Sequence, residues 1–241
     1  MTDKKSLTIM QLYPEAMSIY GDWGNTLTLK KRIEWHGYTA TIIDYNPGDT
    51  FPETIDILIG GGGQDSGQKR IQNDLQAIAP KLRALAESGT PMLVVCGLYQ
   101  LFGRFFKTTT GDIIPGINIF AAETHAGPER LIGNIIIEND KFGDIVGYEN
   151  HSGQTFLDAG STPLGHVRLG AGNSGQDETE GAIIHNVIGT YLHGSLLPKN
   201  PAIADFLIEK AAIKKYGEFE ASVIDDRFAQ KARDVAKKRP R

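Results

Sequence analysis

Residues 91–100 have the sequence PMLVVCGLYQ, and this stretch contains the single cysteine of the 241-residue chain. Four apolar residues, two of them β-branched, predict a short buried strand of a parallel sheet that ends at Cys96. Gly97 follows at once, and the apolar residues 98–102 predict a short helix that stops at Gly103. Strand, tight turn and helix together predict a nucleophile elbow, a strained turn that holds a reactive side chain above a helix N-terminus.

The position of Cys96 favours a nucleophile over a core residue. A helix N-terminus carries partial positive charge and unpaired N–H groups, which favour the thiolate and offer donors to an oxyanion. A lone cysteine is more commonly an inert, buried small hydrophobe. Here Gly97 follows directly, and the carboxyl end of a strand is where open α/β sheets place their sites. We therefore expect Cys96 to be the nucleophile of an enzyme.

The sequence before Cys96 alternates strands with helices. The hydrophobic pattern predicts strands over residues 6–12, 38–44 and 55–59, and helices over residues 26–35 and 68–87. Such alternation is typical of a parallel sheet with right-handed crossovers. The predicted fold is α/β, with a flavodoxin-like, doubly wound and mostly parallel sheet.

After residue 106 the composition and the hydrophobic pattern of the sequence change. Residues 108–126 are polar and contain glycine, which predicts loops, whereas residues 130–138 and 144–150 resemble antiparallel strands. A strand pair is predicted over residues 181–185 and 187–193, and helices over residues 201–216 and 223–236. We expect one large α/β domain over residues 1–218, with an added antiparallel β segment, and a C-terminal helical, basic tail over residues 219–241.

Composition excludes several classes of protein. The chain is 40% hydrophobic and 22% charged with a formal net charge of −4, which is ordinary for a globular protein and argues against nucleic acid as a partner. No apolar run reaches the roughly 20 residues of a membrane span. One cysteine excludes an internal disulfide, and residues 1–6 are too polar for a signal peptide, so a cytoplasmic location is expected. The basic residues 237–241 are interpreted as a solvated tail.

Four consecutive glycines, residues 60–63, follow the predicted strand 55–59. No Lys-Ser or Lys-Thr follows them, so a phosphate-binding loop is a weak interpretation. If that strand neighbours the strand of Cys96, the backbone N–H of Gly61 or Gly62 can face the elbow. Together with the N–H of Gly97 it would form a two-donor oxyanion hole. A merely flexible turn is the alternative.

Among six histidines, His193 is the expected partner of Cys96. It ends an apolar run and is followed by Gly194, which mirrors the placement of Cys96. A cysteine and a histidine at the ends of neighbouring strands suit nucleophilic acyl transfer, in which imidazole moves the thiol proton to the leaving amine. The remaining histidines are interpreted as structural: His36, His125, His151, His166 and His185. No pair has the spacing of metal ligands, so no metal is expected.

Four segments together carry a family resemblance: GGGQD at 61–65, VCGLYQ at 95–100, YENHSG at 148–153 and GTYLHG at 189–194. In this order they resemble class I glutamine amidotransferases of the cobyric-acid-synthase-like branch, and more narrowly the glutaminase subunits of lipid II isoglutaminyl synthases. The resemblance implies hydrolysis of L-glutamine through a thioester on Cys96. The ammonia would pass to a Mur-ligase-like synthetase subunit in a heterodimer. That subunit would use ATP and Mg to amidate the D-glutamate α-carboxyl of lipid II to D-isoglutamine in peptidoglycan synthesis. No cofactor is expected in this chain.

The resemblance also implies roles for residues outside the elbow. Arg130 would hold the α-carboxylate of glutamine, which its planar guanidinium suits, and Gln64 and Gln100 would shape the pocket. Many class I amidotransferases carry a glutamate two positions after the catalytic histidine, where this chain has Ser195. An acid could come from Glu149 or Asp205, or from the partner. We expect the partner to supply it, because this would couple ammonia release to assembly.

Two other enzymatic interpretations remain open at this point. One is a stand-alone cysteine hydrolase of γ-glutamyl substrates, which would need no partner. The other is an amidotransferase subunit for a different acceptor, of the cobyric-acid type. A non-catalytic interaction module is disfavoured because both Cys96 and His193 are present.

Overall fold

The computed structural model describes residues 4–193 and 195–239. Its main sheet has six strands in the order β11-β12-β4-β3-β1-β2, and neighbouring strands are parallel except β11 with β12. The strands are β1 (Ser6–Leu12), β2 (Thr39–Tyr45), β3 (Ile57–Gly60), β4 (Met92–Val95), β11 (Ala182–Ile184) and β12 (Val187–Thr190). The carboxyl ends of β3, β4 and β12 therefore lie together at one edge of the sheet.

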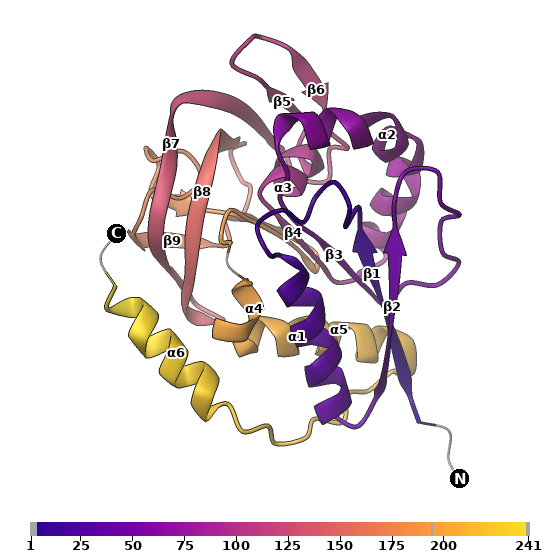
Figure 1. Cartoon of the computed structure of the whole chain (residues 1–241). Helices are drawn as coiled ribbons and strands as arrows, with labels where there is room; N and C mark the ends of the chain where they lie inside the picture. The colour runs from indigo at the N-terminus through magenta and orange to yellow at the C-terminus, as the bar shows by residue number, and fades with distance from the viewer. Residues whose placement is uncertain (1–3, 194, 240–241) are drawn as a thin grey trace.

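Helices cover both faces of the main sheet (Figure 1). On one face α1 (Trp23–Trp35) packs against α5 (Pro201–Tyr216) and the short α4 (Leu196–Lys199). On the other face α2 (Asp65–Glu87) packs against α3 (Gly97–Phe102). The connections β1-to-β2 and β3-to-β4 run in opposite directions across the sheet. Since both crossovers are right-handed, their helices lie on opposite faces.

The central strands are apolar because helices bury them on both sides. Every residue of β3 (ILIG), β4 (MLVV) and β12 (VIGT) is buried, as expected of parallel strands covered on both faces. On α2, the apolar side chains of Ile71, Leu75, Ile78 and Leu82 recur at helical spacing and are buried. Burial of these residues fixes the strand ends from which the site is built.

A second sheet, mostly antiparallel, extends the fold beyond α3 (Figure 1). Its strands are β5 (Phe105–Lys107), β6 (Ile113–Pro115), β7 (Ala122–Asn139), β8 (Gly143–Leu157), β9 (Gly165–Leu169) and β10 (Thr179–Glu180). The long β7–β8 hairpin has an irregular register between Ala126 and Leu131. The N–H of His193 donates to the carbonyl of Tyr148 at 2.7 Å, and this bridge joins the hairpin to the segment that follows β12.

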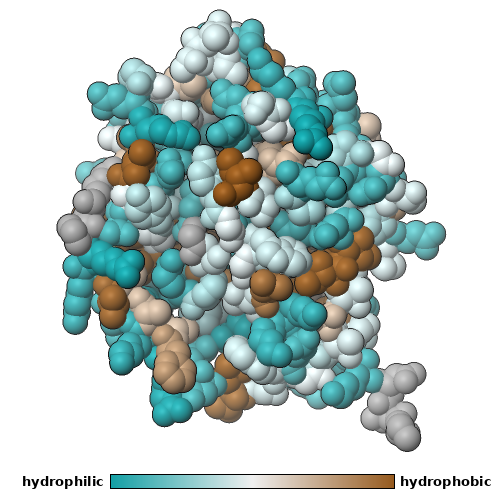
Figure 2. Space-filling model, viewed as in Figure 1, coloured by the Kyte–Doolittle hydropathy of each residue, from teal (hydrophilic) through white to brown (hydrophobic). Residues whose placement is uncertain are grey.

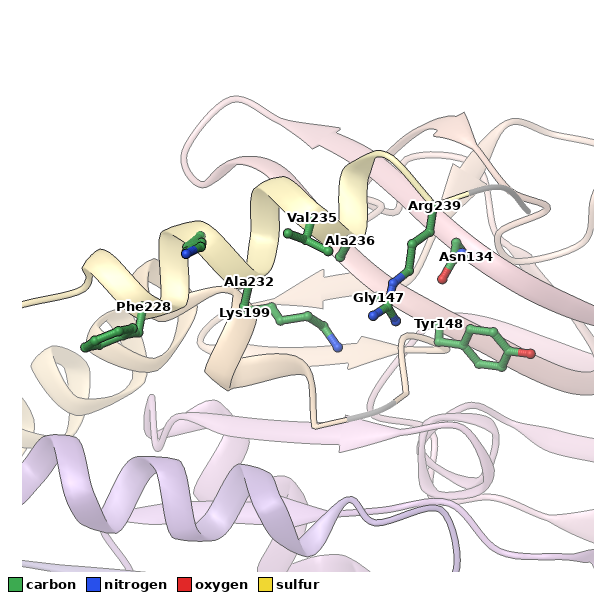
Figure 3. Close-up of a pocket in the computed structure, with 10 residues that line it drawn as sticks. Asn134, Gly147, Tyr148, Lys199, Phe228, Ala232, Val235, Ala236 and Arg239 are labelled. Carbon is green, nitrogen blue, oxygen red and sulfur yellow. The ribbon is translucent and has the colours of Figure 1, made fainter.

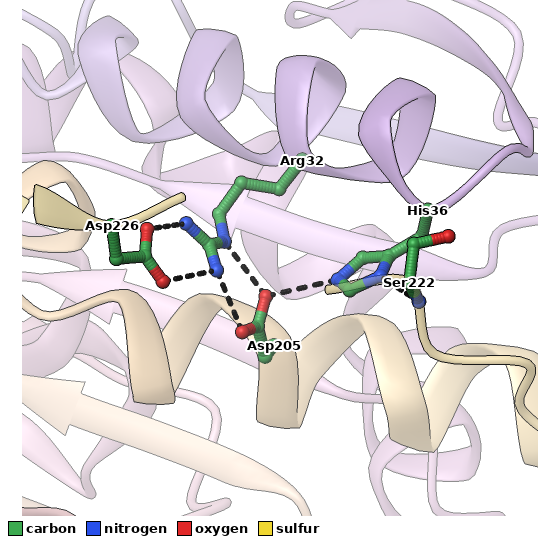
Figure 4. A network of polar contacts seen from close by, with 5 residues as sticks. All are labelled: Arg32, His36, Asp205, Ser222 and Asp226. Carbon is green, nitrogen blue, oxygen red and sulfur yellow. Dashed lines mark hydrogen bonds and ion pairs between the residues drawn. The ribbon is translucent and has the colours of Figure 1, made fainter. Parts of the chain in front are cut away.

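The C-terminal segment is attached to the outside of the domain. Helix α6 (Arg227–Lys237) has no buried residue and lies along α4 and β8 (Figure 1). The guanidinium of Arg32, a buried residue of α1, pairs with Asp205 of α5 at 2.7 Å and with Asp226 at 2.6 Å (Figure 4). His36 accepts the N–H of Ser222 at 3.1 Å, as Figure 4 also shows. The tail is thus held to the helices of one face, and the division after residue 218 stays a prediction.

The face of the molecule in Figure 2 is mainly polar, with apolar side chains in small separate groups. Among the helices that the structure describes, none combines the length and apolar character needed to cross a membrane.

The predicted flavodoxin-like, doubly wound fold with an added antiparallel segment is confirmed. The prediction was wrong for residues 108–126, which include β6 and the start of β7 instead of loops alone. Residues of β7 alternate between buried and exposed along much of its length, so its polar face made the segment resemble a loop. Gly194 and the last two residues of the basic cluster lie outside the described part of the chain.

Candidate active site

Cys96 lies on the sharp turn that the sequence predicts. It joins β4 to α3 with φ 51° and ψ −107°, a backbone conformation that residues other than glycine rarely adopt. The backbone on both sides holds it there, because the N–H of Cys96 donates to Thr190 at 2.8 Å and the N–H of Gln100 donates to Cys96 at 3.0 Å. Such strain, of the order of 1–3 kcal/mol, persists only where the surroundings enforce it and is common at functional sites.

His193 lies beside Cys96, and a glycine separates their side chains. β12 runs parallel to β4, so the segment after β12 reaches the same edge as the elbow. A Cβ added to Gly62 would stand 2.8 Å from Cε1 of His193 and 3.0 Å from Cβ of Cys96. Only a residue without a side chain lets the loop pass between them, and this explains the glycine better than mere flexibility does.

Asp22 is the acid of the site. Its carboxylate is fully buried, and Oδ1 lies 3.4 Å from Nδ1 of His193. Oδ2 accepts the N–H of Gly62 at 2.8 Å. A carboxylate at Nδ1 keeps the proton on that nitrogen and turns Nε2 toward the site. Nε2 of His193 is buried and has no hydrogen-bond partner among the described residues.

The electrostatic environment favours a protonated His193. Burial lowers the pKa of the imidazole, but the charge of Cys96 and the hydrogen bond and charge of Asp22 outweigh it and raise this pKa to about 10. The ring of Tyr20 also lies against His193, with centroids 4.7 Å apart. Cys96, His193 and Asp22 therefore form a triad in which an imidazolium is stabilised beside the sulfur.

The structure changes the predicted oxyanion hole. The N–H of Gly62 is engaged by Asp22, and Gly61 packs against Met17 and Asp22. The N–H groups of Gly63 and Gly97 donate to no acceptor in the described part of the chain. They lie close together, since a Cβ on Gly97 would stand 3.2 Å from the nitrogen of Gly63. Gly97 is kept as a candidate donor and Gly63 is added to it, Gly62 is excluded because its N–H is engaged, and Gly61 stays a prediction.

A pocket of about 470 Å³ opens beside the sulfur of Cys96. It brings together Cys96, Arg130, Gln64 and Gln100, the residues singled out in the sequence. The rest of its lining is Tyr20, Gly63, Asp65, Ser66, Gln68, Phe106, His151 and Ser152. This volume and the few convergent polar groups suit a small polar ligand.

The pocket residues come from different elements. Arg130 lies in the irregular part of β7 and is exposed, and Gln64 precedes α2. Gln100 is buried one turn after Cys96, where it accepts from Gln68 at 2.8 Å and donates to Tyr191 at 3.3 Å. Arg130 can therefore bind a carboxylate of the ligand at the mouth of the pocket. The bond to be cleaved would then lie at the other end, beside Cys96.

The expected sources of the acid are corrected by the structure. Glu149 accepts the N–H groups of Ala171 and Gly172, and Asp205 pairs with Arg32 and His36 (Figure 4). The acid beside Nδ1 of His193 is Asp22, from the same chain. An acid from the partner is therefore not needed to complete the triad.

Besides Gly63, sequence reasoning missed Asp22 and His151. Asp22 belongs to a Gly-Asp-Trp-Gly-Asn cluster that predicted only a turn, and nothing in its spacing indicates contact with a residue 171 positions away. His151 was interpreted as structural but lines the pocket. It lies within β8, in the segment YENHSG that carries part of the family resemblance, and this was the available signal.

A second hollow, of about 580 Å³, lies between α6 and the strand β8 (Figure 3). Phe228 and Val235 of α6 form one wall, and Tyr148 and Lys199 belong to the other. It contains none of Cys96, His193 or Asp22, so it is separate from the reactive group.

The fold and the site define a cysteine-dependent amidotransferase of the doubly wound α/β class. The chain belongs to the family of the CobB/CobQ-like glutamine amidotransferase domain, whose model matches residues 8–201.

Relatives and solved structures agree with this family. The chain is 39% identical to lipid II isoglutaminyl synthase (glutamine-hydrolyzing) subunit GatD of Staphylococcus aureus, over 95% of this chain and 94% of that one. It is 37% identical to the GatD subunit of Streptococcus pneumoniae, over 88% and 83%. A crystal structure of a glutamine amidotransferase matches with a TM-score of 0.58 at 16% identity, covering 84% of this chain and 98% of the other, and so supports the fold.

Proposed function

We propose that this chain is the glutaminase subunit of a lipid II isoglutaminyl synthase. The observation that carries the proposal is the triad of Cys96, His193 and Asp22 beside a polar pocket that contains Arg130. The GatD relatives, which are named as subunits of that enzyme, support the choice of acceptor.

The first half of the reaction forms a thioester. The sulfur of Cys96 attacks the amide carbon of L-glutamine, and the carbonyl oxygen becomes an oxyanion facing the N–H groups of Gly63 and Gly97. The tetrahedral intermediate collapses as the C–N bond breaks. Nε2 of the imidazolium of His193 gives its proton to the leaving nitrogen, which departs as ammonia. Asp22 keeps the ring oriented through Nδ1.

The second half regenerates the thiolate. Neutral His193 takes a proton from water, and the resulting hydroxide attacks the thioester carbon. The C–S bond then breaks, which releases glutamate and leaves the thiolate beside the imidazolium. Arg130 holds the α-carboxylate throughout, so that binding energy from the remote end orients the amide.

The proposed partner is a Mur-ligase-like synthetase in a cytoplasmic heterodimer. It would bind ATP and Mg, activate the D-glutamate α-carboxyl of lipid II and receive ammonia from this chain. The described residues of this chain contain no group of three or more side chains suited to hold a metal ion. We propose that the activation step takes place in that other subunit, because the GatD relatives are named as one subunit of the synthase.

The test uses the complex of this chain with its synthetase. Cys96→Ala should abolish amidation driven by glutamine, while high ammonium should still support amidation of lipid II. Loss of both activities in a folded complex would mean that this chain also builds the synthetase site. Amidation driven by glutamine that persists without the thiol would contradict the proposal.

One observation favours a second candidate, a stand-alone hydrolase of γ-glutamyl substrates. The acid Asp22 comes from this chain, so the triad does not depend on a partner. Rapid release of amines from γ-glutamyl peptides, faster than hydrolysis of free glutamine, would favour this function over the amidotransferase.

A further inference from the structure

His151 carries a buried nitrogen that nothing in the described part of the chain satisfies. The residue is 1% exposed, and its Nε2 has no hydrogen-bond partner there. A buried polar atom without a partner is uncommon in folded proteins and requires an explanation. His151 lines the pocket that also contains Cys96 and Arg130, so a ligand in that pocket can supply the partner.

The unpaired nitrogen is an acceptor. Nδ1 of His151 lies 2.6 Å from the carbonyl oxygen of Gly153, which can only accept, so Nδ1 carries the proton and Nε2 carries a lone pair. Burial is the main cause that lowers the pKa of His151 to about 3, so the ring is neutral over the whole working range of pH. The group that completes the site must therefore donate an N–H or O–H.

The ring is held in one plane. It stacks on Tyr191 with a centroid distance of 3.6 Å and an interplanar angle of 6°. The Tyr191 hydroxyl is fixed in turn by Thr155 at 2.6 Å. Stacking on Tyr191 and the hydrogen bond of Nδ1 fix the orientation of the ring, so the lone pair of Nε2 points in one direction. Such pre-organisation favours a role in recognition over a space-filling role.

The position of His151 indicates which donor of the substrate it meets. His151 pairs across the hairpin with Leu131, the neighbour of Arg130, and the charges of His193 and of Arg130 both act on its ring. If Arg130 holds the α-carboxylate, the α-ammonium lies on the adjacent carbon, at the same end of the pocket. The amide of the substrate lies at the other end, against Cys96.

We propose that Nε2 of His151 accepts a hydrogen bond from the α-ammonium of bound L-glutamine, which makes His151 a determinant of specificity for the free amino acid. This inference rests on the proposed function and adds to it the selection of the substrate's amino group. A peptide-bonded or deaminated analogue would leave the buried lone pair unsatisfied or weakly satisfied.

The test compares L-glutamine with 4-carbamoylbutanoate, which has the same amide and carboxylate but no α-amino group. His151→Phe keeps a ring against Tyr191 and removes the acceptor. We expect kcat/KM for L-glutamine to fall about 10- to 100-fold, mainly through KM, as for a lost hydrogen bond to a charged group. The value for 4-carbamoylbutanoate should change by less than about threefold, since no such bond is lost.

Two further variants make the result specific. His125→Phe is the matched control, because His125 lies on β7, outside the pocket lining, and should leave both substrates unaffected. His151→Gln, which retains an acceptor oxygen, should recover part of the preference for L-glutamine and serves if the phenylalanine variant does not fold. An equal fall for both substrates, or no fall for either, would overturn the proposal.

Binding separates this inference from the proposed function. Calorimetry with Cys96→Ala protein measures the affinity for both compounds without turnover. A preference for L-glutamine that His151→Phe abolishes supports the inference even if no hydrolysis is found. Hydrolysis by the wild type, together with a preference that survives the substitution, would refute the inference and leave the proposed function intact.

Discussion

The carboxylate of Asp22 contacts His193 at Nδ1 across 3.4 Å and holds the N–H of Gly62 at 2.8 Å with its other oxygen. One buried side chain thus orients the imidazole and also fixes the glycine loop that passes between His193 and Cys96. The turn before α1 is therefore part of the reactive centre.

Asp22→Asn should lower kcat for glutamine hydrolysis by the isolated chain by about 10² to 10⁴, since the amide no longer stabilises the imidazolium. KM should change little, because Asp22 is not in the pocket lining. Steady-state kinetics measure both. Asp49→Asn, on an exposed loop, is the control. Unchanged kcat for Asp22→Asn in the isolated chain would show that Asp22 is not the acid of the triad.

Gly62→Ala should reduce kcat/KM by at least about 100-fold, because the new Cβ would lie within 3.0 Å of both His193 and Cys96 and misplacement of about 1 Å has effects of this size. Gly160→Ala provides the comparison. That glycine has φ +86° and open space around it, so the change should reduce stability by about 1 kcal/mol without loss of activity. Equal activity of the two variants would contradict the arrangement.

His193 should titrate near pH 10 instead of near 6.5, and its titration should move to lower pH in Cys96→Ala, which removes the thiolate charge. Because the folded state binds this proton more tightly than the unfolded chain, its contribution to stability is complete below about pH 6.5. The contribution is lost as the pH rises through about 10. Imidazole NMR shifts over pH 5–11 provide the measurement. A wild-type transition below pH 7 would refute the ion pair.

Arg32→Leu should lower the free energy of unfolding by about 2 kcal/mol, since charge-assisted hydrogen bonds to two carboxylates are lost. The two aspartates are about one-third exposed and can be rehydrated, which limits the effect. The segment after residue 218 should become more sensitive to protease, with kcat unchanged. Lys31→Leu, which removes an exposed pair with Glu34, should change stability by less than about 0.5 kcal/mol. Equal effects of the two variants would show that Arg32 does not tether the tail.

The sequence sufficed to predict Cys96 and His193 because each follows an apolar strand of a parallel sheet, and the carboxyl ends of such strands meet. It did not suffice for Asp22, whose contact with His193 depends on how the turn before α1 packs against the glycine loop. That packing joins residues distant in sequence and leaves no periodic signal. The same reason explains why the prediction of Gly62 as an oxyanion donor is wrong. Its N–H donates to Asp22 and is therefore not available to an oxyanion.

The second sheet was only partly predictable. The strand β7 extends over Ala122–Asn139, but the alternation of buried and exposed residues in it is interrupted between Ala126 and Leu131. A bulge breaks the two-residue period on which strand prediction relies. Arg130 lies in this irregular part, so the departure from regular pattern coincides with a pocket residue.

The central claim is that Cys96 attacks the amide carbon of glutamine while this chain's own His193 and Asp22 activate it. Mass spectrometry of the isolated chain after treatment with 6-diazo-5-oxo-L-norleucine tests it most directly. The account predicts one covalent adduct, on Cys96, that forms much more slowly in Asp22→Asn and is absent in Cys96→Ala. An adduct that persists in Cys96→Ala, or labelling of the wild type that requires the partner subunit, would contradict it.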